Sequence, residues 1–216
     1  MVPPGVFRPR SDTWLLAELI RSEDRIPGSA VLDVCTGSGV LAVAAAQRGA
    51  RQVTAVDVSR RAVLSAWLNA RLNGVRVRAL RGDLFAPVRD EPFDAIVSNP
   101  PYLPADGDEL PAAGPTRAWD AGHDGRTLLD RIIDGAPALL RPGGVVMLIH
   151  SSLTGVDATL ERLREAGLDG AEVLARRRGP LGPLLAARAP ELERRGLLRP
   201  GEREEELVAI RAVRAA

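Results

Sequence analysis

The segment Asn99–Pro100–Pro101–Tyr102 places an amide, two prolines and an aromatic ring directly after the apolar run Phe93–Val97. The prolines lock two φ angles and keep the preceding residues extended, so the nearby carbonyl groups point in fixed directions. The side-chain oxygen of Asn99 and the carbonyl of Pro100 could then each accept a hydrogen bond from one –NH2 group. Tyr102 offers a flat face on which an amide or a base can stack. We therefore predict catalytic roles for Asn99, Pro100 and Tyr102, with Pro101 and Tyr102 contacting the substrate.

Such a pair of acceptors suits the chemistry of a planar amide or amine nitrogen. The lone pair of that nitrogen is conjugated, so the nitrogen is a poor nucleophile until hydrogen bonds hold it and disfavour its delocalised state. Its proton becomes acidic only as the new bond forms. Positioning and hydrogen bonding in the transition state should therefore do most of the catalysis, and no strong base is required.

A glycine-rich turn, Thr36–Gly37–Ser38–Gly39, follows the apolar segment that contains Asp33. Glycines let the backbone approach a ligand closely, and the helix expected next presents free N–H groups. The turn could hold a pyrophosphate or the carboxylate and amino groups of a methionine moiety. Asp57 follows Gly37 by about 20 residues, the spacing at which an acid bonds ribose hydroxyls. This region alone is compatible with either a dinucleotide or S-adenosylmethionine.

Two further acidic residues favour S-adenosylmethionine over a dinucleotide. Asp33 would face an ammonium group, whereas beside a pyrophosphate it would repel. Asp83, after another predicted strand, could accept from an adenine amine. Three acids at three successive strand ends fit a cationic adenosyl ligand better than a phosphorylated one.

Strands and helices are expected to alternate along the chain. An alternation of this kind predicts an α/β fold, in which a mainly parallel sheet is covered by helices on both faces. The last two strands should form an antiparallel pair, because no crossover helix separates them. The expected strands are Ala30–Val34, Gln52–Val56, Val75–Leu80, Phe93–Val97, Val145–Ile149, Ala171–Ala175 and Leu207–Val213. The expected helices start near Ser11 and span Val40–Arg48, Ser59–Asn73, Arg126–Leu140, Gly155–Ala166 and Leu184–Arg195.

Residues 1–216 are expected to form a single domain, with residues 176–206 as an insertion between the last two strands. We expect the polar side chains of Ser11–Asp12–Thr13 to cap the first helix. Trp14 and Trp67 lie at helical apolar spacing and are expected in the core.

Composition excludes several classes of protein. A net charge of +1 gives no broad electrostatic footprint for nucleic acid, although it does not exclude such a substrate. The single cysteine, Cys35, rules out an internal disulfide and fits a reducing cytoplasm; we expect it to pack as a small apolar residue. No apolar run has the length of a signal peptide or a membrane span, so a cytoplasmic protein is expected.

At these motifs the sequence resembles the class I S-adenosylmethionine-dependent methyltransferases with the Asn-Pro-Pro-Tyr signature. It is most similar to the HemK-type glutamine methyltransferases of peptide-chain release factors. The resemblance covers most of the chain and rests on four segments, which are residues 7–13, 33–39, 99–102 and 118–126.

The resemblance implies a Rossmann-like seven-stranded sheet with a reversed last strand, and S-adenosylmethionine as methyl donor. The implied acceptor is the glutamine of a Gly-Gly-Gln tripeptide, and the product is N5-methylglutamine. We expect no counterpart of the N-terminal domain of bacterial members, so the resemblance is to the short archaeal and eukaryotic type, some of which need a small activator subunit. The implied and inferred cofactor contacts are Thr13, Asp33, Thr36, Gly37, Gly39, Asp57, Val58, Asp83, Leu84 and Asn99.

Trp119 and His123 are further candidates for contact with the substrate. Trp119 could cover the pocket, and His123 could touch the acceptor. The spacing of His123 and His150 does not suit metal ligation, so no metal is expected.

Other functions remain open at this point. The same site could methylate an exocyclic amine of a base in RNA or DNA, or a small molecule. A continuous basic stripe leading into the pocket would favour nucleic acid. A nicotinamide-dependent oxidoreductase or a catalytically silent binding module is the third class.

Overall fold

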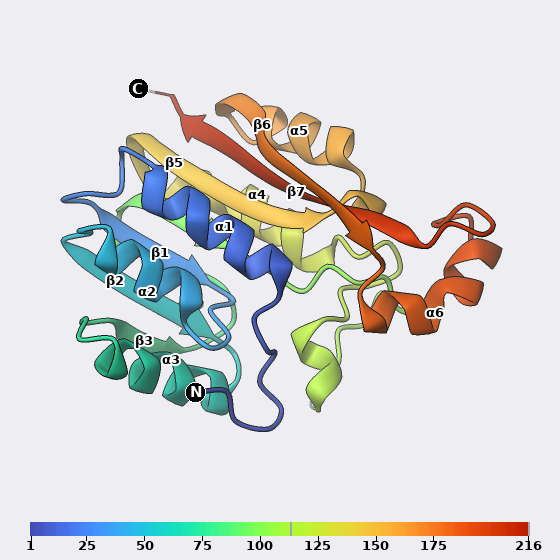
Figure 1. Cartoon of the computed structure of the whole chain (residues 1–216). Coiled ribbons are helices and arrows are strands. Elements are labelled where there is room, and N and C mark those ends of the chain that lie inside the picture. Colours follow the sequence, from blue (N-terminus) through green and yellow to red (C-terminus); the bar gives the residue numbers. More distant parts are fainter. Residues whose placement is uncertain (113, 216) are drawn as a thin grey trace.

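The structure of the protein, a computed structural model, describes residues 1–112 and 114–215 (Figure 1). Seven strands form one sheet in the order β3-β2-β1-β4-β5-β7-β6. The strands are β1 (Ala30–Val34), β2 (Gln52–Asp57), β3 (Arg78–Arg81), β4 (Phe93–Ser98), β5 (Leu140–Ser151), β6 (Leu168–Pro180) and β7 (Glu204–Arg214). The α-helices are α1 (Ser11–Ser22), α2 (Val40–Gln47), α3 (Arg60–Leu72), α4 (Thr127–Leu139), α5 (Val156–Glu165) and α6 (Pro183–Arg194).

The sheet has the predicted mixed topology. Strands β1 to β5 are parallel to their neighbours, and β7 runs antiparallel to both β5 and β6. The reversed last strand is thus confirmed. Because the parallel strands share a direction, their carboxyl ends meet at one edge, where ligands bind in open α/β sheets.

Helices cover both faces of the sheet (Figure 1). Helices α1 and α2 pack on one face with Leu16, Ile20 and Leu41, while α4 and α5 pack on the other with Ile132 and Leu163. The central strand β1 is buried at all five residues, as expected for a parallel strand covered on both sides.

Several element ends differ from the sequence-based expectation. Strand β3 begins only at Arg78, and β5 begins at Leu140, directly after α4. The two strands of the final hairpin continue pairing as far as Pro180 and Glu204, so only residues 181–203 lie outside the ladder. Within that stretch, α6 packs its apolar face on the loop that follows β4, next to Tyr102.

The prediction that the polar side chains of Ser11–Asp12–Thr13 cap α1 is wrong. Arg10 is the N-cap residue, and no side chain caps the helix. Asp12 lies inside the first turn and is buried. Its carboxylate is committed to other partners in the site.

The expected burial of two tryptophans is also wrong. Trp14 is 46% exposed and Trp67 is 44% exposed. The neighbouring small residues Ala17, Ala66 and Ala70 fill the buried positions of these helices instead. Arg71 lies over the ring of Trp67, with its guanidinium carbon 5.5 Å from the ring centre. None of the helices in the described residues combines the length and apolar character that crossing a bilayer requires.

A candidate active site between two cavities

Two cavities meet at the carboxyl edge of the sheet. The first has a volume of about 730 Å³ and the second about 340 Å³. Both volumes lie within the range of ligand sites, which is roughly 300–1,000 Å³. Four residues line both cavities: Phe7, Asn99, Pro101 and Ala118. Asn99 therefore stands where a ligand in one cavity can touch a ligand in the other.

The glycine-rich turn forms one wall of the first cavity. Thr36 and Gly37 line it, and no atom lies within 4 Å of where a Cβ of Gly37 would be. Asp33, fully buried beneath the turn, accepts hydrogen bonds at Oδ2 from Thr36 Oγ1 (2.5 Å) and from the backbone N–H of Ala42 (3.0 Å). Its Oδ1 is buried without a partner among the described atoms. Burial raises the pKa of Asp33 to about 7, against the hydrogen bonds from Thr36 and Ala42.

Gly39 serves packing, not ligand approach. It does not line the cavity, and a Cβ there would lie 2.8 Å from Cα of Ala66 in α3. Its φ of 84° is a further reason for glycine. The turn thus needs Gly37 for open space and Gly39 for the close approach of α3.

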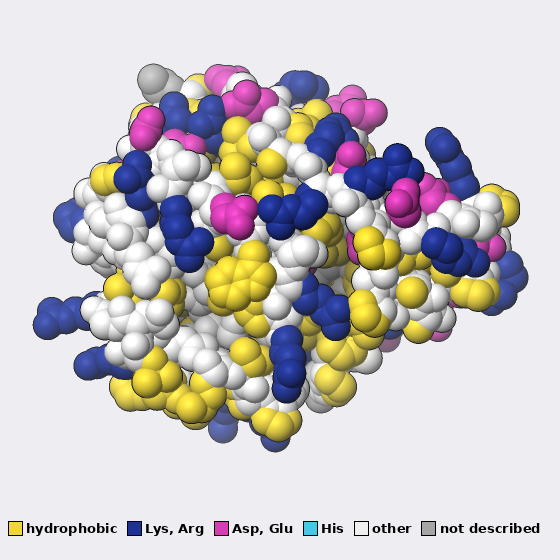
Figure 2. Space-filling model, viewed as in Figure 1, with side chains coloured by type: hydrophobic (Ala, Val, Ile, Leu, Met, Phe, Trp, Pro, Cys, Tyr) yellow, Lys and Arg dark blue, Asp and Glu magenta, His cyan; other side chains and the backbone are white. Residues whose placement is uncertain are grey.

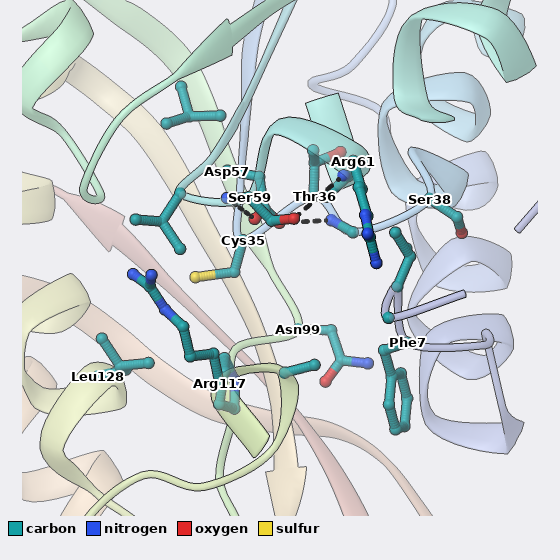
Figure 3. Close-up of a pocket in the computed structure, with 18 of the residues that line it drawn as sticks. Phe7, Cys35, Thr36, Ser38, Asp57, Ser59, Arg61, Asn99, Arg117 and Leu128 are labelled. Atoms are coloured by element: carbon teal, nitrogen blue, oxygen red, sulfur yellow. Dashed lines mark hydrogen bonds between the residues drawn. The ribbon is translucent and has the colours of Figure 1, made fainter. Parts of the chain in front are cut away.

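Asp57 joins the turn to the end of β2. Its Oδ2 accepts from the backbone N–H of Gly37 (2.9 Å) and its Oδ1 from that of Ser59 (2.8 Å), as the dashed lines in Figure 3 show. Burial raises the pKa of Asp57, opposed by these two hydrogen bonds and by the charge of Arg117. Each oxygen retains a lone pair for a hydroxyl group of a ligand.

Asp83, Val58 and Leu84 also line the first cavity. The carboxylate of Asp83 forms an ion pair with Arg131 at 2.6 Å, and its side chain is 58% exposed. Leu84 and Cys35 have positive φ angles of 45° and 59°. Residues other than glycine rarely adopt positive φ angles, and those that do are concentrated at functional sites. Cys35 packs against the core, and burial raises the pKa of its thiol well above the usual value.

The residues that close the first cavity are not among those predicted from the sequence. Phe7 and Pro9 come from the N-terminal arm, which is fixed to α3 by Arg61 donating to the carbonyl of Pro4 (3.1 Å). Arg117 comes from a short helical turn, residues 115–118. In Figure 3 the amide of Asn99 lies between Phe7 and Arg117. The only available signal was the presence of Phe7 and Pro9 in a segment that carries the family resemblance.

A chain of hydrogen bonds fixes Asn99. Its Nδ2 donates to Thr13 Oγ1 (3.0 Å), and that hydroxyl donates to Asp12 Oδ1 (3.2 Å). The other oxygen of Asp12 accepts from the hydroxyl of Tyr102 (2.9 Å). Asn99 Oδ1 is buried without a partner among the described residues. The arrangement leaves one strong acceptor free where the cavities meet.

The second cavity contains the predicted substrate residues Pro100, Pro101, Tyr102 and Trp119. Burial raises the pKa of the Tyr102 phenol well above its usual value, and the charges of Asp12 and Glu205 add to this. The hydroxyl therefore stays protonated at neutral pH. His123 is exposed and lies outside the linings of both cavities.

The residues fit S-adenosylmethionine. The open space at Gly37 suits the amino acid end of the cofactor, and Asp57 suits the ribose. Asp33 does not line the cavity itself and lies behind the turn, fully buried.

Comparison with known proteins gives the family. The methyltransferase small domain family matches residues 3–113. A protein of Methanocaldococcus jannaschii assigned as a protein N5-glutamine methyltransferase is 37% identical over 186 residues, which are 86% of this chain and 92% of that protein. A release factor glutamine methyltransferase of Geobacter sulfurreducens is 42% identical over 155 residues, 68% of this chain and 54% of the relative. The chain thus spans about half the length of this bacterial relative.

Solved structures share the fold. The T. thermophilus 16S rRNA N2 G1207 methyltransferase, in complex with AdoMet and guanosine, superposes with a TM-score of 0.66 at 22% identity. The superposition covers 98% of this chain and 46% of that one. Because the family matches more than half of the chain and a relative matches most of it, this protein belongs to the methyltransferase small domain family and is a HemK-type S-adenosylmethionine-dependent N-methyltransferase.

Proposed function

We propose that this enzyme methylates the side-chain amide nitrogen of a glutamine in a protein substrate, such as the Gly-Gly-Gln segment of a release factor. The observation that carries the proposal is the buried, unpartnered Oδ1 of Asn99 at the junction of the two cavities. An acceptor kept free of protein partners in a buried site is costly unless a ligand donates to it. A primary amide has two N–H groups, one for Asn99 Oδ1 and one for the carbonyl of Pro100.

The chain's own residues then prepare the amide for attack. Two acceptors hold the nitrogen and weaken its conjugation, while the ring of Tyr102 offers a surface for the amide plane. When bound, S-adenosylmethionine supplies the electrophilic methyl group from the first cavity. As the N–C bond forms, the nitrogen becomes acidic and releases one of its two protons to water, so no side chain of the site needs to act as a strong base.

The charge pattern supports a protein acceptor over a nucleic acid. Three arginines line the second cavity, and two of them are neutralised, because Arg177 pairs with Glu18 (3.2 Å) and Arg178 with Glu204 (2.7 Å). The third, Arg10, lies over the ring of Phe7. Figure 2 shows arginine side chains scattered among acidic ones, without a continuous basic band on the face in view. A phosphate backbone would favour unpaired arginines along its path.

The direct test is methyl transfer from labelled S-adenosylmethionine to a peptide containing Gly-Gly-Gln and to a cell lysate. Label should map to the glutamine nitrogen by mass spectrometry and should survive nuclease but not protease. Label lost to nuclease would instead identify a base amine as the acceptor. Assays with the chain alone and with lysate added show whether a small activator subunit is required.

Asn99→Ala should lower kcat by about 100-fold or more, the usual effect of removing one group that acts on the transition state. S-adenosylmethionine binding should be largely retained. Asn73→Ala is the matched control, because Asn73 is exposed at the end of α3, away from both cavities. Full activity of Asn99→Ala would refute the proposed role of this amide.

A further inference from the structure

The far wall of the second cavity is built by the final hairpin. Residues 177–180 and 182–185, including Leu184 and Leu185 of α6, form most of this wall, and Glu205 and Leu207 of β7 complete it. None of these residues belongs to the Asn-Pro-Pro-Tyr motif. The cavity is also larger than a single side-chain amide needs, so it has room for neighbouring parts of an acceptor chain.

Three consecutive glutamates begin β7, and they differ in their surroundings. Glu204 pairs with Arg178 (2.7 Å) and Glu206 with Arg176 (2.5 Å). Glu205 points to the opposite face of the strand, as the alternation of side chains requires, and lines the cavity. Its charge contributes to the raised pKa of Tyr102, which places it near the catalytic motif.

Only one oxygen of Glu205 has a protein partner. Oε1 accepts from the backbone N–H of Gly182 (2.9 Å), whereas Oε2 is buried without a partner among the described residues. A buried carboxylate oxygen without a donor is unfavourable, because it has lost water and gained nothing in return. Holding the Gly182 turn requires one oxygen and does not explain the other.

We infer that Glu205 Oε2 accepts a hydrogen bond from a backbone N–H of the acceptor protein, next to the glutamine that is methylated. The inference rests on the proposed function and extends it from the side-chain amide to the peptide backbone. Asn99 and Pro100 take both N–H groups of the side chain, so the donor to Glu205 comes from the main chain. Glycine residues beside the glutamine would let that backbone come close to the hairpin wall.

The test compares three glutamine substitutions in steady-state kinetics with a Gly-Gly-Gln peptide. Glu205→Gln replaces the free acceptor with an –NH2 group while the amide oxygen can still hold Gly182. We expect its KM for the peptide to rise about tenfold with kcat unchanged, because a backbone contact binds ground and transition states equally. Glu204→Gln and Glu206→Gln remove the same charge from the outer face and should keep the wild-type KM. Glu206→Gln is the stricter control, because its partner Arg176 lies outside the cavity lining, whereas Glu204→Gln frees Arg178, which is part of it.

A second measurement separates substrate contact from bracing of α6. Peptides with one backbone nitrogen methylated, at each position around the glutamine in turn, remove one donor at a time. One of them should raise KM about tenfold for the wild type and leave the KM of Glu205→Gln nearly unchanged. A KM of Glu205→Gln equal to the two controls, or a wild type insensitive to every methylated backbone, overturns the inference. An equal rise for both enzymes would show that Glu205 only supports the hairpin. If the wild type methylates no glutamine peptide, the proposed function fails and this inference fails with it.

Discussion

The orientation of the Asn99 amide follows from the charge of Asp12. A carboxylate only accepts hydrogen bonds, so the hydroxyl of Thr13 must donate to Asp12 and can only accept from its other side. Asn99 therefore presents its –NH2 group to Thr13, and Oδ1 is the atom that faces the cavities. The same carboxylate holds the hydroxyl of Tyr102, so one buried acid positions two residues of the motif.

Thr13→Val should lower kcat about tenfold, because the amide of Asn99 loses the acceptor that fixes its orientation. Thr13→Ser retains the hydroxyl and should restore most of the activity. Because Thr13 also lines the first cavity, the affinity for S-adenosylmethionine is measured for both variants by calorimetry. Equal kcat values for the two variants would show that the hydroxyl does not orient Asn99.

The buried carboxyl of Asp33 links stability to pH. Burial raises its pKa from 3.8 to about 7, so between these values the folded chain holds a proton that the unfolded chain has lost. Its contribution to stability therefore falls as pH rises from about 4 to about 7 and is constant above that range. At pH 8 the folded protein carries an ionised and incompletely partnered carboxylate.

Asp33→Asn should consequently raise Tm by several degrees at pH 8 and by less at pH 4, measured by calorimetry without ligand. The same change should weaken binding of S-adenosylmethionine, since the carboxylate behind the turn no longer attracts the ammonium group of the ligand. A gain in Tm that is the same at both pH values would contradict the raised pKa. Unchanged affinity would contradict the attraction of the ammonium group by Asp33.

At the scale of elements, the two glycines of the turn report on different contacts. Gly39→Ala should lower the free energy of unfolding by about 2 kcal/mol or more, because its Cβ would meet the backbone of α3 in addition to the strain of a positive φ. Gly37→Ala meets no atom and should cost about 1 kcal/mol from φ alone. Urea unfolding measures both changes. For cofactor affinity we expect the opposite ranking, with the larger loss in Gly37→Ala than in Gly39→Ala.

The main elements of the fold were predictable because their periodicity is local. Buried parallel strands such as Val145–Ile149 read as continuous apolar runs, and the ends of β1, β2 and β4 placed the polar residues of the site at one edge. The predictions that were wrong concern residues whose position is set by a contact with a distant part of the chain. The polar residues Ser11 to Thr13 suggested an N-terminal cap of α1. Asp12 instead accepts a hydrogen bond from Tyr102, which is 90 residues away in sequence.

Parts of the site that depend on such distant contacts could not be read from the sequence. Arg117 lies in a loop whose residue types predict no position, and Phe7 reaches the cavity only because its arm is fixed to α3. Glu205 is one of three adjacent glutamates, and only the pairing of β6 with β7 distinguishes it from its neighbours. The residue types at the strand ends were enough to predict the chemistry of the site. The residues that form the cavity walls could be identified only from the folded structure.

In the whole molecule, the two cavities are closed by segments that lie far apart along the chain. The N-terminal arm and residues 110–118, of which residue 113 is not described, close the first cavity. The final hairpin closes the second. Four residues, Asn99 among them, line both cavities, and Arg188 of α6 joins the hairpin to the first cavity by its ion pair with Asp120 (2.7 Å). Each ligand should therefore order its own set of segments.

Amide hydrogen exchange followed by mass spectrometry can separate the two sets. S-adenosylmethionine alone should slow exchange in the arm and in the loop before Trp119, because a ligand that fills the first cavity suppresses local opening of the segments that cover it. A Gly-Gly-Gln peptide added to the complex should then slow exchange in residues 177–185. Helix α5 touches neither cavity and serves as the internal reference. Protection of residues 177–185 by S-adenosylmethionine alone, with the arm unaffected, would mean that the cofactor binds in the second cavity and the acceptor in the first.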